Sequence, residues 1–369
     1  MNKKFFHTFF DCGFSKIRAG TFNKNNKSEV FYSESEFFID RSNLEFKIEK
    51  IIASLEKDTD EYINNINLMI DSPKMISIGI SLSKKLDLLK LKQANIQFLV
   101  QEAKQQILKY YTNHNIVHII INNYKIDGVD YSYLPNEIKC DSISLDMLFI
   151  CLPTDLIAYF KNIFSKSNIS VEQIICSSYA KSINYRNNIN QSGHVSFIDI
   201  GFNKTSIISY FNDKILSLDI LPIGSNNITK DISQILNIDL EKSEKEKRNF
   251  EQNLKHSNHK KISIVMLQKI IFARMEEILE LCAKSIQSNL YSLDKFKMIL
   301  MGEGSKILDN SHKDKIYFSN NIDFLDETLE DICDSGFNFI EEPNKQEVVL
   351  VPKKHTKQGF FEKLFHFFS

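Results

Sequence analysis

The chain has 369 residues, which is enough to bury the cores of two or more domains. Its net charge is −1, with 25% charged and 43% hydrophobic residues, and this balance excludes a protein that binds nucleic acid through an overall basic field. No stretch reaches the roughly eighteen apolar residues of a membrane-spanning helix. The six cysteines are scattered without a C-x-x-C pair, as expected for reduced thiols in a cytosol.

The first predicted element is a β-hairpin near the N-terminus, with the sequence FFDCGFSKIRAG. An apolar strand leads into Asp11, the turn carries Gly13, Ser15 and Lys16, and an alternating strand returns. A carboxylate at the end of a buried strand is costly unless something binds it. The turn presents backbone N–H groups, a hydroxyl and an ammonium to one point, which is the chemistry that a phosphate needs.

The next stretch predicts a sheet crossed by a helix and then a change of character. Alternation over 29–40 continues the sheet, helical spacing covers 43–57, and 66–70 is typical of a buried strand. From 72 to 153 the pattern indicates a small α+β insert, with strands expected over 75–81, 117–121 and 143–152 and a helix over 94–111. Its loops carry few glycines and no acid cluster, so we expect binding rather than chemistry there.

A second hairpin, VSFIDIGFNKTSIISY, repeats the Asp-x-Gly pattern about half a chain later. Its first strand carries Asp199 as its only acid, and its turn carries Gly201, Lys204 and Thr205. Two such hairpins indicate two related halves. Helices are then expected over 226–236 and 265–290, before a third glycine turn, MILMGEGSKI, in which Gly302 and its neighbours allow close approach to a ligand.

The order of these turns resembles the two phosphate motifs and the adenosine motif of the actin, Hsp70 and sugar-kinase superfamily, and within it the FtsA family of bacterial division proteins. The matching motifs are Asp11-x-Gly-x-Ser-Lys, Asp199-Ile-Gly-x-x-Lys-Thr, Gly302-x-Gly-Ser, the PIGSNNITKDI run from Pro222, Ser243-Glu244-x-x-Lys247 and the helix with Arg274 and Glu277. The resemblance implies an α/β, actin-like two-lobed fold with ribonuclease H-like halves, an FtsA-type α+β inserted subdomain and a C-terminal amphipathic helix.

The implied domain organisation places lobe I in two parts, 1–73 and 154–190, on either side of the inserted subdomain at 74–153. The inner subdomain of lobe II begins at 191–225 and the outer subdomain covers 226–296. Residues 297–342 complete the inner subdomain and return to lobe I. A flexible linker at 343–358 then precedes an amphipathic membrane-targeting helix at 359–369.

The C-terminal sequence GFFEKLFHFFS predicts this last helix directly. On a helical wheel one stripe contains Phe360, Phe361, Leu364, Phe365 and Phe368. A helix of this length extends about 16 Å, too short to cross a bilayer and suited to lying in its surface. Docking on the core or in a partner's groove is the alternative; the preceding polar linker and the resemblance favour a membrane.

The resemblance also implies a site for ATP and Mg²⁺. Asp11 and Asp199 would position the magnesium, with no direct protein ligand assigned. The phosphate-binding residues would be Gly13, Ser15, Lys16, Gly201, Lys204 and Thr205. The adenosine-binding residues would be Gly224, Glu244, Lys247, Gly302, Gly304 and Ser305. Arg274 and Glu277 would bind the C-terminal peptide of FtsZ.

Ordinary structural roles compete with several of these assignments. A lone Asp-x-Gly turn is usually only a β-turn, so the site rests on three turns in the right order. Glu244 and Lys247 are also consistent with a solvated ion pair, and a surface salt bridge is the default for Arg274 and Glu277. A histidine pair at 114 and 118 has no third ligand nearby, so we expect no metal there.

One departure from the family pattern bears on activity. Gly201 is followed by Phe202 and Asn203, where related proteins commonly carry small residues, and bulk there restricts close approach of the backbone to a phosphate. We therefore expect nucleotide binding with weak or absent hydrolysis, and no catalytic residue is assigned.

The function implied by the resemblance is an ATP-binding, filament-forming protein. It would anchor the FtsZ ring to the cytoplasmic side of the inner membrane at the division septum, and its insert would contact other division proteins. One alternative is a sugar or acetate kinase of the same superfamily, which would need an acceptor pocket and a catalytic acid and has no use for an amphipathic tail. A second is a PilM-like scaffold of a pilus or secretion assembly.

Overall fold

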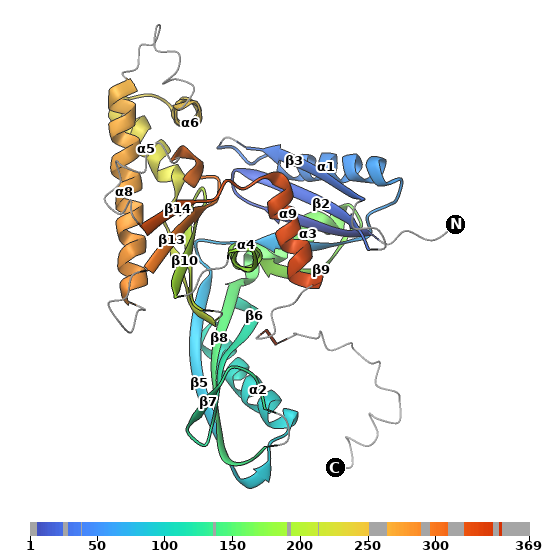
Figure 1. The fold of residues 1–369 in the computed structure, drawn as a ribbon. Helices are drawn as coiled ribbons and strands as arrows, with labels where there is room; N and C mark the ends of the chain where they lie inside the picture. Colours follow the sequence, from blue (N-terminus) through green and yellow to red (C-terminus); the bar gives the residue numbers. More distant parts are fainter. Residues whose placement is uncertain are drawn as a thin grey trace.

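The computed structural model describes residues 6–24, 29–37, 39–135, 138–189, 193–212, 214–250, 264–288, 296–308, 321–341 and 347–348. Within these residues the chain forms two five-stranded sheets and one four-stranded sheet, with helices packed against them (Figure 1). The membrane-targeting helix expected at 359–369 lies outside the described residues. Among the helices that are described, none is long and apolar enough to cross a membrane.

The first sheet has the strand order β3-β2-β1-β4-β9. Its strands are β1 (Phe6–Cys12), β2 (Lys16–Asn23), β3 (Val30–Glu36), β4 (Asn65–Ile70) and β9 (Ser170–Cys176). The hairpin partners β1, β2 and β3 are antiparallel, whereas β4 and β9 run parallel to β1. The apolar residues of β1 and β4 are buried on both faces, as is usual for the central parallel strands of a sheet covered by helices.

The second sheet repeats this arrangement, with the order β12-β11-β10-β13-β14. Its strands are β10 (His194–Ile200), β11 (Thr205–Phe211), β12 (Lys214–Leu221), β13 (Phe296–Met301) and β14 (Ile322–Phe324). Again the first three strands are antiparallel and the last two are parallel to the first. The two sheets confirm the actin-like fold of two related halves. We call the first sheet and its helices the first lobe, and the second sheet and its helices the second lobe.

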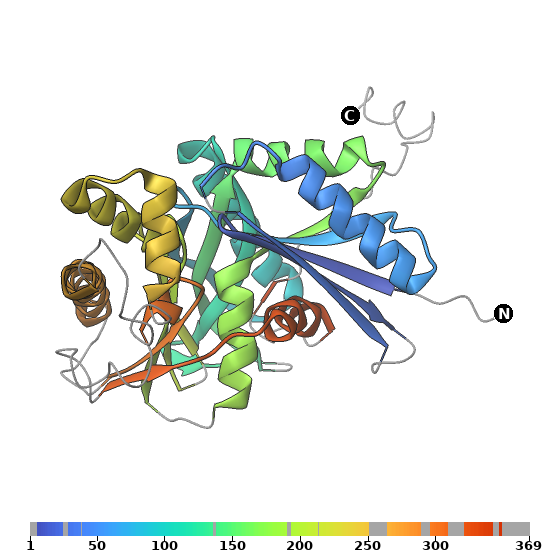
Figure 2. The ribbon, with the colours of Figure 1, turned by 90° about the horizontal axis from the view of Figure 1, so that it is seen from above.

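The helices cover these sheets with amphipathic faces. Those of the first lobe are α1 (Leu44–Thr59), α3 (Thr154–Lys166), α4 (Ser177–Asn188) and α9 (Leu329–Glu341). Those of the second lobe are α5 (Ser225–Leu236), α6 (Leu240–Arg248) and α8 (Ile264–Ser288). Helix α4 lies between the lobes and contacts both β9 and β11 (Figure 2). The side chains on α4 can therefore reach groups from both halves.

The insert forms the third sheet, with the order β5-β8-β6-β7, and extends from the lower side of the lobes in Figure 1. Its elements are β5 (Ile76–Lys90), α2 (Gln93–Tyr110), β6 (His114–Ile126), β7 (Val129–Tyr131) and β8 (Lys139–Pro153). Helix α2 buries Ile96, Leu99 and Ile107 against a separate apolar cluster.

The end of the described chain is held on the insert. The backbone N–H of Val348 donates to the carbonyl oxygen of Ile119 at 2.8 Å, and Glu347 forms a bridge with Ile120 of β6. The carboxylate of Glu347 lies 2.6 Å from Nδ1 of His118, whose Nε2 accepts the backbone N–H of Cys176 at 2.9 Å. Both ring nitrogens of His118 are thus used in protein contacts, as expected for a histidine that does not bind a metal.

Among the elements that were not predicted from the sequence are β12, β14 and α9. Helix α9 carries Gly336 in its centre, which lowers its helix propensity. A β-carbon at Gly336 would lie 2.5 Å from Sδ of Met69 and 2.9 Å from the ring of Phe9, so the glycine allows α9 to pack closely on the first sheet. The chain thereby returns from β14 of the second lobe to the first lobe, which a local sequence pattern does not indicate.

Candidate functional site

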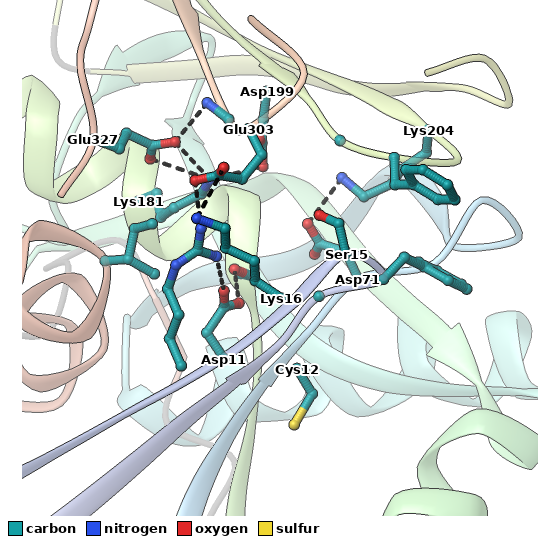
Figure 3. Close-up of a pocket in the computed structure, with 18 of the residues that line it drawn as sticks. Asp11, Cys12, Ser15, Lys16, Asp71, Lys181, Asp199, Lys204, Glu303 and Glu327 are labelled. Atoms are coloured by element: carbon teal, nitrogen blue, oxygen red, sulfur yellow. Dashed lines mark hydrogen bonds and ion pairs between the residues drawn. The ribbon is translucent and has the colours of Figure 1, made fainter. Parts of the chain in front are cut away.

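The two Asp-x-Gly hairpins face each other across a pocket between the lobes. Asp11 and Asp199 are the next-to-last residues of β1 and β10, at corresponding places in the two sheets. The acids that line the pocket are Asp11, Asp71, Asp199, Glu303 and Glu327, and the bases are Lys16, Arg18, Lys181 and Lys204. The pocket also includes Gly13, Gly201 and Gly302. Ser15 lies in it beside the charged side chains labelled in Figure 3. The three glycine turns therefore meet at one place.

The third turn packs directly on the second. Gly302 has a φ of +89°, and a β-carbon there would clash with Oδ1 of Asp199 and lie 2.7 Å from the carbonyl oxygen of Ile200. A β-carbon on Gly304 would also lie 2.7 Å from that oxygen, to which the backbone N–H of Gly304 donates at 2.8 Å. These glycines are required for contact between the two turns, a role that the sequence analysis did not consider.

Lys181 connects the two lobes at the floor of the pocket. Its Nζ lies 3.1 Å from Oδ2 of Asp199 and 3.2 Å from Oε1 of Glu327, and all three side chains are buried. Tyr185, one turn further along α4, donates its hydroxyl to Oε1 of Glu327 at 2.9 Å. Burial lowers the pKa of Lys181, but the carboxylates of Asp199 and Glu327 outweigh it and raise the pKa above its ordinary value, so the lysine is charged.

Arg18 forms a second bridge between the lobes. Its Nη1 lies 3.4 Å from Oδ2 of Asp11 and its Nη2 lies 2.5 Å from Oε1 of Glu303. Asp11 also accepts a hydrogen bond of 2.7 Å from the hydroxyl of Ser177. Burial raises the pKa of Asp11, and the charges of Arg18 and Lys181 and the hydrogen bond from Ser177 offset only part of that effect.

Two lysines from the predicted phosphate turns are paired in the same way. Nζ of Lys16 lies 2.9 Å from Oε1 of Glu36 and 3.3 Å from Oε2 of Glu303. Nζ of Lys204 lies 2.9 Å from Oδ2 of Asp71, across the cleft on the first lobe. Burial raises the pKa of Asp71, but the charge of Lys204 and its hydrogen bond outweigh burial and lower it. Each carboxylate that lines this pocket therefore contacts a cation.

Three of the predicted residues lie beside the cleft without lining it. Thr205 is buried and donates its hydroxyl to the carbonyl oxygen of Ile223 at 2.8 Å. Ser305 is buried and donates to the carbonyl oxygen of Gly302 at 2.8 Å. A β-carbon at Gly224 would lie 2.6 Å from the carbonyl oxygen of Gly201. These three residues shape the turns rather than face the pocket.

A wider pocket adjoins the first one. The two share Ser15, Lys16, Phe202 and Glu303, so they form one continuous cleft. The narrow end, among the ion pairs, has a free volume of about 80 Å³ and the wide end one of about 580 Å³. The wide end is lined by Ser225, Glu244, Lys247, Phe250, Gly304 and neighbouring residues. Most of the cleft's open space is therefore away from Asp11 and Asp199.

Glu244 and Lys247 form an ion pair of 2.6 Å, but both are buried and not solvated. Glu244 also accepts from the hydroxyl of Thr229 and from Nε of Arg248, and Lys247 donates to the carbonyl oxygen of Ser225 at 3.0 Å. Burial lowers the pKa of Lys247 more than Glu244 raises it. The pair fixes α6 against α5 and presents charged groups to the wide end of the cleft.

Arg274 and Glu277 lie away from the cleft, on α8. Nε and Nη2 of Arg274 hold the carboxylate of Asp231 at 2.6 and 2.9 Å, and Nη1 lies 2.6 Å from Oε2 of Glu277. The structure thus contains the salt bridge that is the default for this spacing, with Asp231 of α5 as an additional partner. The five apolar residues predicted to bind the membrane, from Phe360 to Phe368, lie outside the described residues.

Sequence comparison finds similarity to one protein family. The family described as "Cell division protein FtsA" matches residues 196–348. Cell division protein FtsA of Buchnera aphidicola subsp. Schizaphis graminum is 26% identical over 163 residues, which is 44% of this chain and 38% of the relative. FtsA of Bacillus subtilis is 25% identical over 188 residues, 47% of this chain and 43% of the relative. This chain is similar to FtsA over part of its length. Each of these alignments spans less than half of the curated protein.

Structural comparison finds a similar fold in a solved structure. A structure of the PilM–PilN type IV pilus biogenesis complex has a TM-score of 0.63 and covers 88% of this chain and 89% of that one, at 11% sequence identity. At this identity the likeness shows the fold alone. Because the sequence relatives and the family description both name FtsA, the PilM-like alternative is not favoured.

Several residues of the cleft were not predicted from the sequence. Asp71 directly follows the apolar strand INLMI, the same pattern that marked Asp11 and Asp199, so this signal was present in the sequence. Lys181 stands in a largely uncharged helix segment, SSYAKSI, where a buried cation needs a partner. Glu327 carries no local signal, because its partner Lys181 is distant in sequence, and the pairing of Arg18 with Glu303 likewise joins distant segments.

The cleft suits a nucleotide better than it suits a magnesium ion. The actin-like fold suggests nucleotide binding, and the wide pocket and the glycine turns suit a nucleoside and its phosphates. A magnesium ion requires carboxylates with free oxygens or waters between them. Asp11 and Asp199 instead contact Arg18 and Lys181, so the residues at the narrow end do not fit a divalent cation.

Proposed function

We propose that this protein is a cell division protein that binds ATP in the cleft between its lobes, assembles into filaments, and anchors the FtsZ ring to the cytoplasmic side of the inner membrane at the septum. The observation that carries the proposal is the meeting of both Asp-x-Gly hairpins and the third glycine turn at one cleft, in a chain whose family relatives are division proteins.

Within this proposal the cleft divides into two regions. The turn around Gly13, Ser15 and Lys16 and the turn at Gly201 would face the phosphates. The wide end, with Glu244, Lys247 and Ser225, would hold the adenosine. Thr205, Gly224 and Ser305 would support these turns from behind. Binding would fix the relative angle of the lobes, and that angle would decide whether protomers stack.

Hydrolysis would be weak or absent. A catalytic base must have a free lone pair within reach of the attacking water. Each of the carboxylates lining the narrow end is held by Arg18, Lys16, Lys181, Lys204 or Lys306. Phe202 and Asn203 add bulk to the second phosphate turn. A kinase of the same superfamily would require a catalytic acid free to act here, and this pairing argues against that alternative.

The remaining contacts would be made by the outer surfaces. Arg274 and Glu277 would contact the C-terminal peptide of FtsZ, and the insert would contact other division proteins. The C-terminal stripe, Phe360, Phe361, Leu364, Phe365 and Phe368, would lie in the lipid surface. One short helix binds lipid weakly and reversibly, whereas a filament carrying many helices would remain attached through avidity.

Co-sedimentation of FtsZ with liposomes tests the anchor. The intact chain should carry FtsZ into the liposome pellet, whereas a chain ending at Gln358 should leave it in the supernatant. A matched control replaces Glu362 by Gln, on the polar side of the predicted helix, and should behave as the intact chain does. Equal recruitment by the shortened chain would remove the anchoring role from this proposal.

A further inference from the structure

We propose that the narrow end of the cleft holds the phosphates of a nucleotide without a divalent cation, because the ammonium of Lys181 stands between Asp199 and Glu327 where a metal's charge would be required. The inference rests on the proposed nucleotide binding and adds a property of this chain's own residues, namely that magnesium is dispensable.

Lys181 contacts two acids at the narrow end of the cleft. Its Nζ lies 3.1 Å from Asp199 and 3.2 Å from Glu327, and the three side chains come from α4, β10 and the segment before α9 (Figure 3). The resemblance implies that Asp199 positions magnesium. In the structure Oδ2 of Asp199 and Oε1 of Glu327 pair instead with the ammonium of Lys181.

The other carboxylates are neutralised in the same way. Arg18 spans Asp11 and Glu303, and Lys204 holds Asp71. These acids come from both lobes, and each cation comes from a different element than the acid it contacts. The pairs Arg18–Glu303 and Lys204–Asp71 therefore depend on the meeting of the two lobes, whereas Arg18–Asp11 lies within the first hairpin. A divalent cation entering here would meet fixed positive charge on at least two sides.

The coordination geometry of magnesium also disfavours a metal ion at the narrow end. Magnesium takes six ligands in a near-octahedral arrangement at about 2.0–2.1 Å and usually keeps several waters. The acids of the narrow end are 2.5–3.4 Å from nitrogen atoms. A metal bound directly to the paired oxygens would have to displace these ion pairs. Phosphate oxygens, in contrast, accept hydrogen bonds from the same ammonium and guanidinium groups and from the turn backbones.

The decisive measurement compares the binding of ATP to the intact chain in magnesium and in excess EDTA. Fluorescence anisotropy of a labelled ATP analogue detects the binding. We expect the Kd in EDTA to be within about twofold of the Kd in magnesium, or lower. Binding that appears only with magnesium would overturn this inference and leave the proposed nucleotide binding intact. Absence of binding in both buffers would overturn the nucleotide proposal and this inference with it.

Variants at position 181 test whether Lys181 makes ATP binding independent of magnesium. Lys181→Gln removes the ammonium and keeps a hydrogen-bonding group, so its ATP affinity should become at least about tenfold weaker in EDTA than in magnesium. Lys181→Arg keeps the charge and should remain independent of magnesium. Lys284→Gln removes a lysine that is 66% exposed on α8 and serves as the matched control. If a folded Lys181→Gln variant binds ATP equally well with and without magnesium, the assignment to Lys181 is overturned. If that variant does not fold, the wild-type comparison and Lys181→Arg test the assignment.

Discussion

Lys181 of the first lobe and Asp199 of the second form a buried ion pair of 3.1 Å across the interface between the two halves of the molecule. Lys204 with Asp71 and Arg18 with Glu303 cross the same interface in the same manner. The closed arrangement of the lobes is thus supported by the protein's own charges, in addition to any ligand that binds between them. These pairs are the most direct targets for tests of the structure.

Replacing Lys181 by Met should strongly destabilise the fold. The change leaves Asp199 and Glu327 buried beside each other without their shared cation, and loss of one partner of a buried pair costs roughly 3–5 kcal/mol. Urea denaturation should measure this loss in the free energy of unfolding. Lys284→Met, at an exposed position of α8, should change it by less than about 0.5 kcal/mol. Similar values for both variants would contradict the bridge described for Lys181.

Replacing Gly302 by Ala should destabilise through two separable effects. Gly302 has a φ of +89° and has no room for a β-carbon beside Asp199 and Ile200. Gly128 has a φ of +85° with open space around it, and Gly79 has open space and no positive φ. The fall in Tm should therefore be largest for Gly302→Ala, smaller for Gly128→Ala, which carries the backbone strain of about 1 kcal/mol alone, and smallest for Gly79→Ala. Equal falls for the first two would mean that the turns do not touch.

The buried acid Glu244 should make stability depend on pH. Burial raises its pKa, but Lys247, Thr229 and Arg248 outweigh burial and lower it from the ordinary value of 4.5. An acid with a lowered pKa in the folded chain stabilises the fold above its unfolded pKa, and that contribution is lost as the pH falls through the folded pKa.

The difference in free energy of unfolding between the wild type and Glu244→Gln should consequently be largest near pH 7 and should shrink below about pH 4.5. Urea denaturation at a series of pH values measures it. Glu280→Gln, in an exposed pair with Lys284, is the control and should show little change at any pH. A difference for Glu244→Gln that is constant from pH 7 to pH 3 would contradict the lowered pKa.

Arg274→Ala separates the proposed FtsZ contact from folding. The ion pairs of Arg274 with Asp231 and Glu277 are partly exposed, so their loss should cost about 1 kcal/mol or less. Under the proposed function, affinity for the C-terminal peptide of FtsZ should fall by about tenfold or more, as measured by calorimetry. Lys284→Ala on the same helix should leave both quantities unchanged. Unchanged peptide affinity in a folded Arg274→Ala variant would remove Arg274 from the interface.

The sequence was most informative where a pattern was repeated. Asp11 and Asp199 each end an apolar strand before a glycine turn, and this repetition predicted both the two-fold architecture and the meeting of the turns. The sequence was least informative about which charged residues pair with each other. Nothing near Lys181 indicates that Asp199 and Glu327 are its partners, because these contacts depend on the packing of α4 between the lobes. Likewise Gly302 was interpreted as space for a ligand, whereas that space is filled by the neighbouring turn.

The attachment of Glu347 and Val348 to β6 fixes the point from which the rest of the chain departs. Covalent geometry allows at most about 3.6 Å per residue, so the segment 349–358 reaches no further than roughly 35–40 Å from the insert. If 359–369 lies in a bilayer as proposed, the insert and the lipid surface are neighbours, and the length of this tether limits how far any protomer can rise from the membrane it is bound to.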